Sequence, residues 1–300
     1  MSGLLALDWG TSSLRGALID GEGRVVEERS FGRGILSVPA AGFPAVFGEL
    51  FGDWAADLPL CLISGMAGSK QGWVEAPYCA CPAGFADIAA QLKWLAPLEN
   101  AAIRIAIVPG LCCEHGGLPD VMRGEEVQVF GALDLLGLED ATLVLPGTHS
   151  KWVQARASRI ESFRSFMTGE VYALLRGQSI LARLMPPEGN DALDEDAFRL
   201  GLRNAREGSL LSNAFSARTL GLFDRLPSQA LPSYLSGLVI GEEFRAQGTL
   251  PARLVLVGSA ALVHRYAIAA AEYGAAWQAP PANATWAGLR RVAGTLASTH

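Results

Sequence analysis

Short apolar runs alternate with turn residues and helical stretches along most of the chain. The run at residues 4–7 leads into the turn Asp8–Ser13. A second run, 14–19, is separated from a third, 25–29, by the turn D-G-E-G. Glycine and aspartate tolerate the backbone angles of tight turns, so this pattern predicts a strand, a hairpin and another strand.

Further along, the apolar pattern predicts both strands and helices. Buried strands are expected at 59–64 and 103–108, each ending in a glycine-containing turn. Helices are expected at 45–50 and 85–95, because apolar residues recur there at helical spacing. Strands that alternate with helices indicate an α/β fold with a largely parallel sheet.

The second half of the chain restarts this pattern. It predicts a helix at 124–136, a strand at 141–145, a hairpin formed by 152–155 and 160–163, and a strand at 254–257 followed by a helix from about 261. The string L-A-L-D-W-G-T-S-S of the first half is echoed by L-V-L-P-G-T-H-S-K. Two halves that open with the same strand–loop–hairpin unit suggest two related domains facing a cleft.

Composition narrows the class of protein. The chain has 300 residues, of which 50% are hydrophobic, enough for two domains with large cores. A net charge of −6 argues against a general polyanion binder, so no nucleic-acid partner is expected. The odd count of five cysteines fits a reducing compartment. With no signal-peptide pattern and no long apolar run, we predict a cytoplasmic protein with no membrane partner.

The first loop has the residue types of a phosphate-binding turn. Gly10 lets backbone N–H groups approach a phosphate, and Thr11, Ser12 and Ser13 add hydroxyls. Asp8 at the strand tip suits a metal-bound water, and Arg15 could neutralise phosphate or substrate charge. The alternative is a plain hairpin turn that Asp8 caps.

Two later turns have similar chemistry. Gly147, Thr148 and Ser150 again offer backbone approach and hydroxyls, while His149 and Lys151 add hydrogen-bonding capacity or positive charge, unless they are ordinary surface residues. The turn Gly258–Ser259 follows a buried strand, and its small residues would let an adenine ring pack on the backbone.

With these loops the chain resembles the actin-like ATPase superfamily that includes sugar kinases, and more narrowly the 2-dehydro-3-deoxygalactonokinase family. The matching strings are D-W-G-T-S-S-L-R at 8–15, G-W-V-E-A-P-Y at 72–78, P-D-V-M-R-G-E-E-V-Q at 119–128, L-P-G-T-H-S-K-W-V at 145–153 and F-M-T-G-E at 166–170.

The resemblance implies two actin-like (ribonuclease H-like) α/β domains with a ligand cleft between them. We expect the domains at 1–112 and 113–300, with a final helix at about 286–297 that could pack back on the first domain. The resemblance also implies a kinase that uses ATP and Mg²⁺ to phosphorylate 2-dehydro-3-deoxy-D-galactonate at its 6-hydroxyl, in galactonate and galactose catabolism. One departure is visible: Pro146 stands where the wider superfamily usually has an aspartate.

The resemblance also suggests a general base. In similar sugar kinases the base lies after the last strand of the first domain, which points to Asp120. The alternative is that Asp120 caps the following helix. Glu125 and Glu126 are competing bases, and their own alternative is a solvated first turn favoured by the helix dipole.

The carboxylate of a sugar acid needs a cation or backbone N–H groups. The resemblance offers Arg15, Lys151 and the turn 65–69, including Gly68 and Ser69, for this role. Trp73, Glu75 and Tyr78 could line the sugar-acid pocket, although ordinary core packing explains such aromatic residues equally well.

Other functions stay open at this stage. The protein could phosphorylate a different 2-keto-3-deoxy sugar acid, act as a non-catalytic actin-like sugar-acid sensor, or be an actin-like chaperone or filament ATPase. The sequence leaves the oligomeric state open and allows a homodimer.

Overall fold

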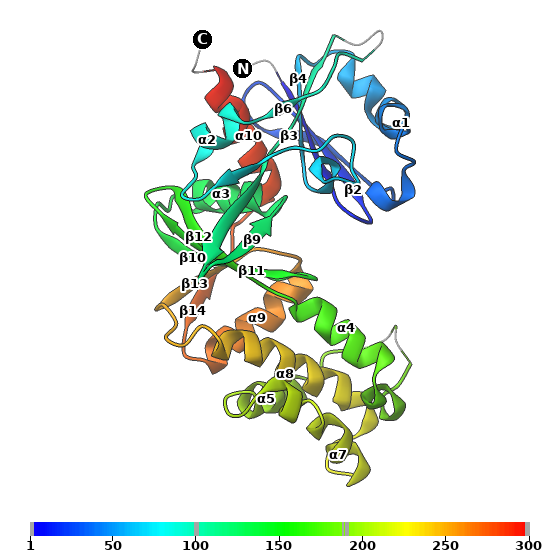
Figure 1. Cartoon of the computed structure of the whole chain (residues 1–300), viewed down its shortest axis with the longest axis vertical. Coiled ribbons are helices and arrows are strands. Elements are labelled where there is room, and N and C mark those ends of the chain that lie inside the picture. Colours follow the sequence, from blue (N-terminus) through cyan, green and yellow to red (C-terminus); the bar gives the residue numbers. More distant parts are fainter. Residues whose placement is uncertain (1–2, 99–101, 188, 190–191, 298–300) are drawn as a thin grey trace. The chain divides into compact units, whose positions relative to one another are not determined.

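The computed structural model describes residues 3–98, 102–187, 189 and 192–297 (Figure 1). The chain divides into two compact units. Unit 1 comprises Met1–Ala141, Val153–Phe163 and Pro280–His300, and unit 2 comprises Thr142–Trp152 and Arg164–Ala279. The division therefore differs from the boundary expected at residue 112.

Two helices explain why unit 1 continues past residue 112. Helix α3 (Glu125–Leu136) packs against α10 (Ala284–Ala297), and both belong to unit 1. The contact is close enough that a β-carbon on Gly288 would lie 1.9 Å from the carbonyl oxygen of Val127. The final helix thus packs within unit 1, next to the helix that begins at the R-G-E-E string.

A six-stranded sheet forms the centre of unit 1. Its strands, in the order β3-β2-β1-β4-β7-β6, are β3 (Val25–Phe31), β2 (Leu14–Ile19), β1 (Leu4–Trp9), β4 (Leu60–Ser64), β7 (Arg104–Ile107) and β6 (Lys93–Trp94). Only the pairs β1–β4 and β4–β7 are parallel. The expectation of a largely parallel sheet is therefore wrong, because tight turns join β1, β2 and β3 as antiparallel neighbours.

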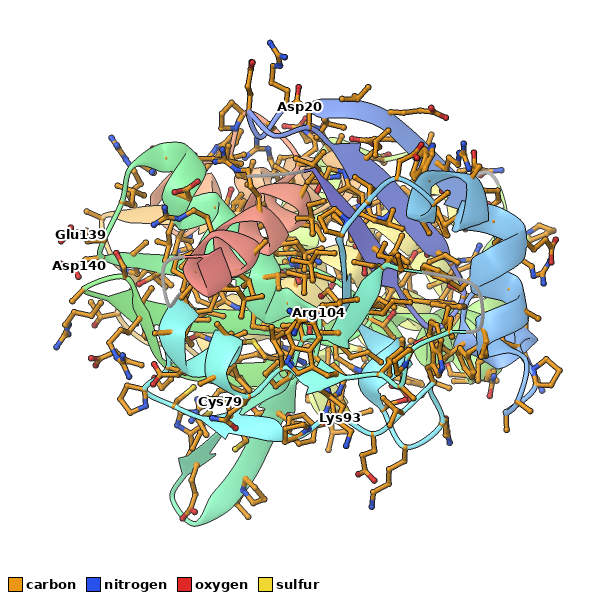
Figure 2. The ribbon with its side chains drawn as sticks, turned by 90° about the horizontal axis from the view of Figure 1, so that it is seen from above. Asp20, Cys79, Lys93, Arg104, Glu139 and Asp140 are labelled. Atoms are coloured by element: carbon orange, nitrogen blue, oxygen red, sulfur yellow. The ribbon has the colours of Figure 1, made fainter. Side chains whose placement is uncertain are left out.

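The helix expected at 85–95 ends early. Helix α2 covers only Phe85–Ala90, and Lys93–Trp94 forms the edge strand β6, paired with β7. The guanidinium of Arg104 on β7 lies 4.1 Å from the ring centroid of Trp94. Figure 2 labels Lys93 and Arg104 on these two strands. Residues 93–94 form a strand because they pair with β7, although apolar residues recur at helical spacing in this part of the sequence.

Unit 1 also contains helix α1 (Phe43–Ala55) and a smaller sheet. Helix α1 extends the predicted helix at both ends and buries Phe43, Phe47 and Phe51 in the core. A three-stranded sheet, β5-β8-β9, was not expected from the sequence. It consists of β5 (Tyr78–Ala80), β8 (Gly110–His115) and β9 (Leu118–Met122). Most of β9 is exposed, so it lacks the apolar pattern that reveals a strand.

A second sheet repeats the topology of the first. Its order is β12-β11-β10-β13-β14, with β12 (Arg159–Phe166), β11 (Ser150–Arg156), β10 (Ala141–Leu145), β13 (Arg253–Leu256) and β14 (Ala276–Gln278). Strands β10, β13 and β14 are parallel neighbours, as β1, β4 and β7 are. The echo between the two halves of the sequence therefore reflects a repeated strand order.

Helices make up most of unit 2. They are α4 (Thr168–Gln178), α5 (Glu195–Asn204), α6 (Leu210–Asn213), α7 (Ser216–Leu222), α8 (Leu231–Arg245) and α9 (Ala260–Glu272). Short 3-10 turns lie at Ile180–Leu184 and Ser228–Ala230 in unit 2, and at Ile35–Ser37 and Met66–Gly68 in unit 1. Helix α8 is buried on nearly all sides. No helix within the described ranges combines the length and apolarity needed to span a bilayer.

Candidate active site

The first loop begins where β1 ends. Asp8 lies opposite Arg15 in the β1–β2 hairpin, and their side chains form an ion pair. The amide of Gly10 donates to the carbonyl of Ser13 at 2.9 Å and closes the turn. The exposed residues Thr11, Ser12 and Ser13 leave their hydroxyls available to a ligand.

The segment Gly34–Leu36 packs against this loop and supports it. The amides of Ile35 and Leu36 donate to the carbonyls of Gly10 and Thr11 at 3.0 and 3.3 Å. A β-carbon on Gly34 would lie 2.2 Å from the carbonyl oxygen of Thr11, so only glycine fits there. The loop is thus held by backbone contacts on one side and exposed on the other.

Three chain segments of unit 1 meet beside Asp8. Asp8 lies opposite Ser64 in the parallel pair β1–β4. A β-carbon on Gly65 (φ 93°) would lie 3.2 Å from Asp8 Oδ1, and one on Gly124 (φ 105°) would lie 3.2 Å from the Cα of Gly65. The amino end of α3, with its two glutamates, is therefore close to the aspartate of the first loop.

The three candidate bases differ in their surroundings. Asp120 lies on β9 opposite Cys113 and accepts a hydrogen bond from the amide of Val121 at 2.8 Å. The idea that Asp120 caps the next helix is wrong, since Gly124 is the capping residue of α3. Glu125 is half-buried and accepts from the amide of Arg123 at 3.0 Å.

Glu126 is a buried carboxyl. One oxygen accepts from the amide of Gly124 at 2.7 Å, and the other has no hydrogen-bond partner among the described residues. Burial raises the pKa of Glu126 to about 8, and the charge of Glu125 adds to this effect. Glu126 has no exposed surface, whereas Glu125 and Asp120 are partly exposed, so these two are the better placed acids.

Arg123 is a candidate anion-binding residue that sequence reasoning missed. Its guanidinium lies 4.3 Å from the ring centroid of Tyr78 and donates to the carbonyl of Ala76 at 2.9 Å. Nε and Nη1 of Arg123 and Oγ of Ser69 are buried without a hydrogen-bond partner in the described part of the chain. A β-carbon on Gly68 would lie 2.8 Å from Nη1. Unused donors of this kind suit a carboxylate ligand.

The other residues expected in the sugar-acid pocket are more scattered. Trp73 packs among Trp9, Phe43 and Phe47, with ring centroids about 6 Å apart. This agrees with the alternative of ordinary core packing. Glu75 is exposed, and Tyr78 is 42% exposed beside Arg123. Tyr78 thus contacts Arg123, a candidate ligand-binding cation.

The second loop follows β10 in unit 2. Pro146 is buried, whereas Thr148 and His149 are exposed, and His149 contacts the carboxylate of Glu170. The hydroxyl of Ser150 points inward and donates to Glu243 at 2.9 Å, so it is already used within the protein. Lys151 is only 5% exposed.

The turn after β13 lies near this loop. A β-carbon on Gly258 would lie 3.6 Å from Cδ of Pro146, and the hydroxyl of Ser259 caps α9 through the amide of Leu262. Beside them is a pocket of about 140 Å³. Its lining residues come from the second loop and from the helices α4, α8 and α9: Gly147, Thr168, Gly169, Tyr172, Ser236, Val239, Ile240, Leu262, Arg265 and Tyr266.

Comparison with known proteins identifies the family. A model of the family described as 2-keto-3-deoxy-galactonokinase matches residues 8–292. The chain belongs to the 2-keto-3-deoxy-galactonokinase family. Its curated relatives include the 2-dehydro-3-deoxygalactonokinase of Escherichia coli K12, which is 35% identical over 98% of each chain. The family and the phosphotransferase class predicted from the sequence are confirmed.

Solved structures agree with this family and its fold. A candidate 2-dehydro-3-deoxygalactonokinase from Sinorhizobium meliloti has 33% identity and a TM-score of 0.88 over 99% of each chain. A xylulose kinase from Lactobacillus acidophilus, at 8% identity, has a TM-score of 0.54 over 99% of this chain and 90% of its own. The predicted actin-like α/β fold is thus confirmed, and membership in a kinase family implies ATP use.

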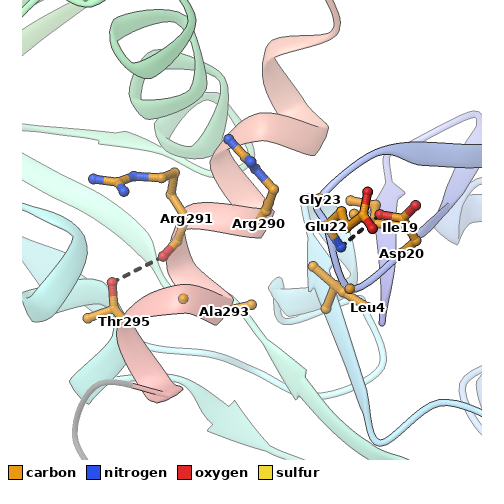
Figure 3. A pocket seen from close by; sticks show the side chains of 11 residues that line it. Leu4, Ile19, Asp20, Glu22, Gly23, Arg290, Arg291, Ala293 and Thr295 are labelled. Carbon is orange, nitrogen blue, oxygen red and sulfur yellow. Dashed lines mark hydrogen bonds between the residues drawn. The ribbon is translucent and has the colours of Figure 1, made fainter. Parts of the chain in front are cut away.

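Unit 1 has a larger pocket, which lies away from the loop after β1. It measures about 430 Å³ and is lined by Leu4 at the start of β1, the turn that includes Asp20, and Arg290 of α10 (Figure 3). Asp8 is at the other end of β1, roughly 13 Å along the strand. Asp20 pairs with Arg24, and Arg290 with Asp134. Neighbours within the protein already neutralise these charges.

Proposed function

We propose that this 2-keto-3-deoxy-galactonokinase family member transfers the γ-phosphoryl group of ATP to the 6-hydroxyl of 2-dehydro-3-deoxy-D-galactonate, in the cytoplasm and as part of galactonate catabolism. The family match across residues 8–292 carries the proposal. The two glycine-containing loops, at the ends of equivalent strands of two similarly ordered sheets, support it.

Asp8 is the residue proposed to hold Mg²⁺. Protein sites usually bind Mg²⁺ through one or two carboxylates together with substrate phosphates and water. The Asp8 side chain is 17% exposed at a strand tip and suits this role. It is paired with Arg15, whose side chain is 41% exposed, and binding of Mg²⁺ to Asp8 would release Arg15 to the phosphates. When bound, the ion would neutralise charge on the phosphates.

Each loop is proposed to bind phosphate through its own backbone and hydroxyl groups. Gly10 and the hydroxyls of residues 11–13 serve the phosphates in unit 1, and Gly147, Thr148 and His149 in unit 2. Ser150 would contribute its backbone, because its hydroxyl is bonded to Glu243. The 140 Å³ pocket, with Gly258 and Ser259 near its rim, is proposed for the nucleoside.

Arg265 in this pocket adds a cation. Its Nη1 donates to Ser236 at 3.3 Å, and the guanidinium forms no ion pair with an acidic side chain among the residues described. We propose that Arg265 contacts the nucleotide.

A carboxylate of the 120–125 segment would take the proton of the sugar hydroxyl. Asp120 is the base expected from the sequence, and the geometry favours Glu125, because it follows Gly124, which lies against Gly65 beside Asp8. Asp120→Asn and Glu125→Gln separate the two. The base variant should lose roughly 100- to 10,000-fold in kcat with little change in ATP affinity, and the other should stay within about tenfold. Equal losses would reject an assignment to either one.

The carboxylate of the sugar acid is proposed to bind Arg123, with Ser69, Gly68 and Lys151 as further candidates. Binding would require the Tyr78 ring to move off the guanidinium. A carboxylate that accepts from Nη1 or from Nε would satisfy one of the buried donors that no described residue uses. Arg123→Lys keeps the charge but loses the guanidinium N–H groups, so KM for the sugar acid should rise roughly tenfold while KM for ATP stays constant.

A coupled ADP-release assay across a panel of 2-keto-3-deoxy sugar acids tests the function. We expect the highest kcat/KM with 2-dehydro-3-deoxy-D-galactonate. A higher value with another acid of the panel would reassign the substrate. Tight binding of the acid without ADP release would instead favour the sensor, and ATP hydrolysis unaffected by any acid would favour a different actin-like ATPase.

A further inference from the structure

Helix α8 carries a glutamate in the interior of unit 2. Glu243 is 1% exposed, and it lies on a helix whose residues are almost all buried. Burial raises the pKa of Glu243 above its ordinary value, while four side-chain hydrogen bonds act in the opposite direction. Buried carboxyls are costly unless they are well bonded, so a specific role is expected for this one.

The two oxygens of Glu243 receive two donors each. Oε1 accepts from Ser150 Oγ at 2.9 Å and from Trp152 Nε1 at 2.6 Å. Oε2 accepts from the Tyr266 hydroxyl at 2.8 Å and from the Thr168 hydroxyl. A carboxylate offers about four acceptor positions and no donor, so the four groups fill its capacity.

These donors come from three separate elements. Ser150 and Trp152 belong to the string P-G-T-H-S-K-W and begin β11, Thr168 begins α4, and Tyr266 lies on α9. Thr168 and Tyr266 also line the 140 Å³ pocket. One side chain therefore connects the end of the second loop to two walls of the pocket.

Further contacts join the same segments. The amide of Glu170 donates to the carbonyl of Thr148 at 3.0 Å. A β-carbon on Gly169 would lie 2.5 Å from the carbonyl oxygen of Gly147. Displacement of α4 would therefore displace the loop, and Glu243 is bonded to both.

We infer that Glu243 is a positioning residue that fixes the loop Gly147–Ser150 and the α4 and α9 walls of the adjoining pocket in the arrangement that binds a nucleoside triphosphate. The nature of the ligand rests on the proposed function. The geometric claim, that one buried carboxyl sets the loop and the pocket together, does not depend on which sugar acid accepts the phosphate.

The test compares Glu243→Gln with Glu243→Met in the full chain. A glutamine oxygen can accept from Ser150 and Trp152, and its amide can donate to the hydroxyl oxygens of Thr168 and Tyr266. A methionine offers none of these contacts. We expect the methionine variant to raise KM for ATP and the Kd for ADP at least about tenfold, and the glutamine variant by no more than about threefold.

Tyr234→Phe is the matched control for destabilisation. The Tyr234 hydroxyl is bonded to Asn204 and Ser216 in another part of unit 2, at 2.9 and 2.6 Å. This variant should lose thermal stability but keep the wild-type KM for ATP. A folded methionine variant with KM and ADP affinity within twofold of wild type would overturn the inference.

Two milder variants keep the inference testable if the methionine variant does not fold. Thr168→Val and Trp152→Phe each remove one donor, and each should raise the Kd for ADP roughly three- to tenfold in calorimetry. Wild-type affinity in both would overturn the inference, as would a wild-type protein that binds no ADP. If the wild type binds ADP but phosphorylates no sugar acid, the proposed function fails while these comparisons still decide the role of Glu243.

Discussion

The two loops follow equivalent strands but have different chemistry. The loop after β1 has a partly exposed aspartate, paired with Arg15, and three exposed hydroxyl residues. The loop after β10 has a buried proline in the place of the acid, and its Ser150 hydroxyl faces the interior. The first loop therefore offers charged and polar side chains to a ligand, whereas the second offers mainly its backbone.

Each loop has a buried glutamate nearby, and the two glutamates differ in how completely they are hydrogen-bonded. Glu243, next to the second loop, accepts four side-chain hydrogen bonds. Glu126, near the first loop, has one bonded oxygen and one without a partner in the described residues. A fully bonded carboxyl stabilises the position of its neighbours, and an incompletely bonded one destabilises the fold when it is ionised.

The largest effect should come from the acid that only the first loop has. Asp8→Ala should lower kcat/KM roughly 100- to 1,000-fold, because it removes the proposed magnesium-binding carboxylate. Pro146→Ala should cost far less, since the proline has no chemical group to lose. Both are measured by ADP release at saturating Mg²⁺. If the proline variant were as impaired as the aspartate variant, the assigned difference between the loops would be wrong.

The next effect concerns stability and pH. The pKa of Glu126 is raised to about 8 in the folded protein from an ordinary value of 4.5. Between these pH values the folded state holds a proton that the unfolded state has lost, so the free energy of unfolding falls as pH rises. The loss should amount to roughly 2–4 kcal/mol by pH 8.

Glu126→Gln should remove this slope. Urea unfolding at pH 5.5 and pH 8 should show the variant gaining stability relative to wild type as pH rises. Glu139→Gln, on the exposed turn after α3 (Figure 2), should leave the slope unchanged. A wild-type slope in the Glu126 variant would contradict the burial argument.

Two glycine substitutions compare the backbone support of the loops. Gly34→Ala would place a β-carbon 2.2 Å from the Thr11 carbonyl oxygen, and Gly169→Ala would place one 2.5 Å from that of Gly147. Each should displace its loop and raise KM for ATP roughly tenfold, about 1.4 kcal/mol. Gly32→Ala has open space around it and should have no effect. A normal KM in either loop variant would show that its loop tolerates the shift.

The smallest effect is expected at His149. Its imidazole is 51% exposed and pairs with Glu170, and exposed pairs contribute less than about 1 kcal/mol. His149→Ala should therefore raise KM for ATP by no more than about threefold. A loss larger than that of Gly169→Ala would make the His149 side chain a principal phosphate ligand and would weaken the view of a backbone-based second loop.

The sequence by itself determined the repeated strand–loop–hairpin units, the family and both loops, because these depend on local apolar patterns and short strings. Strand bounds at 14–19 and 141–145 agree with the structure. Tertiary structure alone decided that Lys93–Trp94 is a strand, that Arg123 has buried donors unused by the described residues, and that Glu243 meets Ser150, which lies 93 residues away. Those features depend on packing between distant segments, and no local sequence pattern predicts which buried polar groups will contact each other.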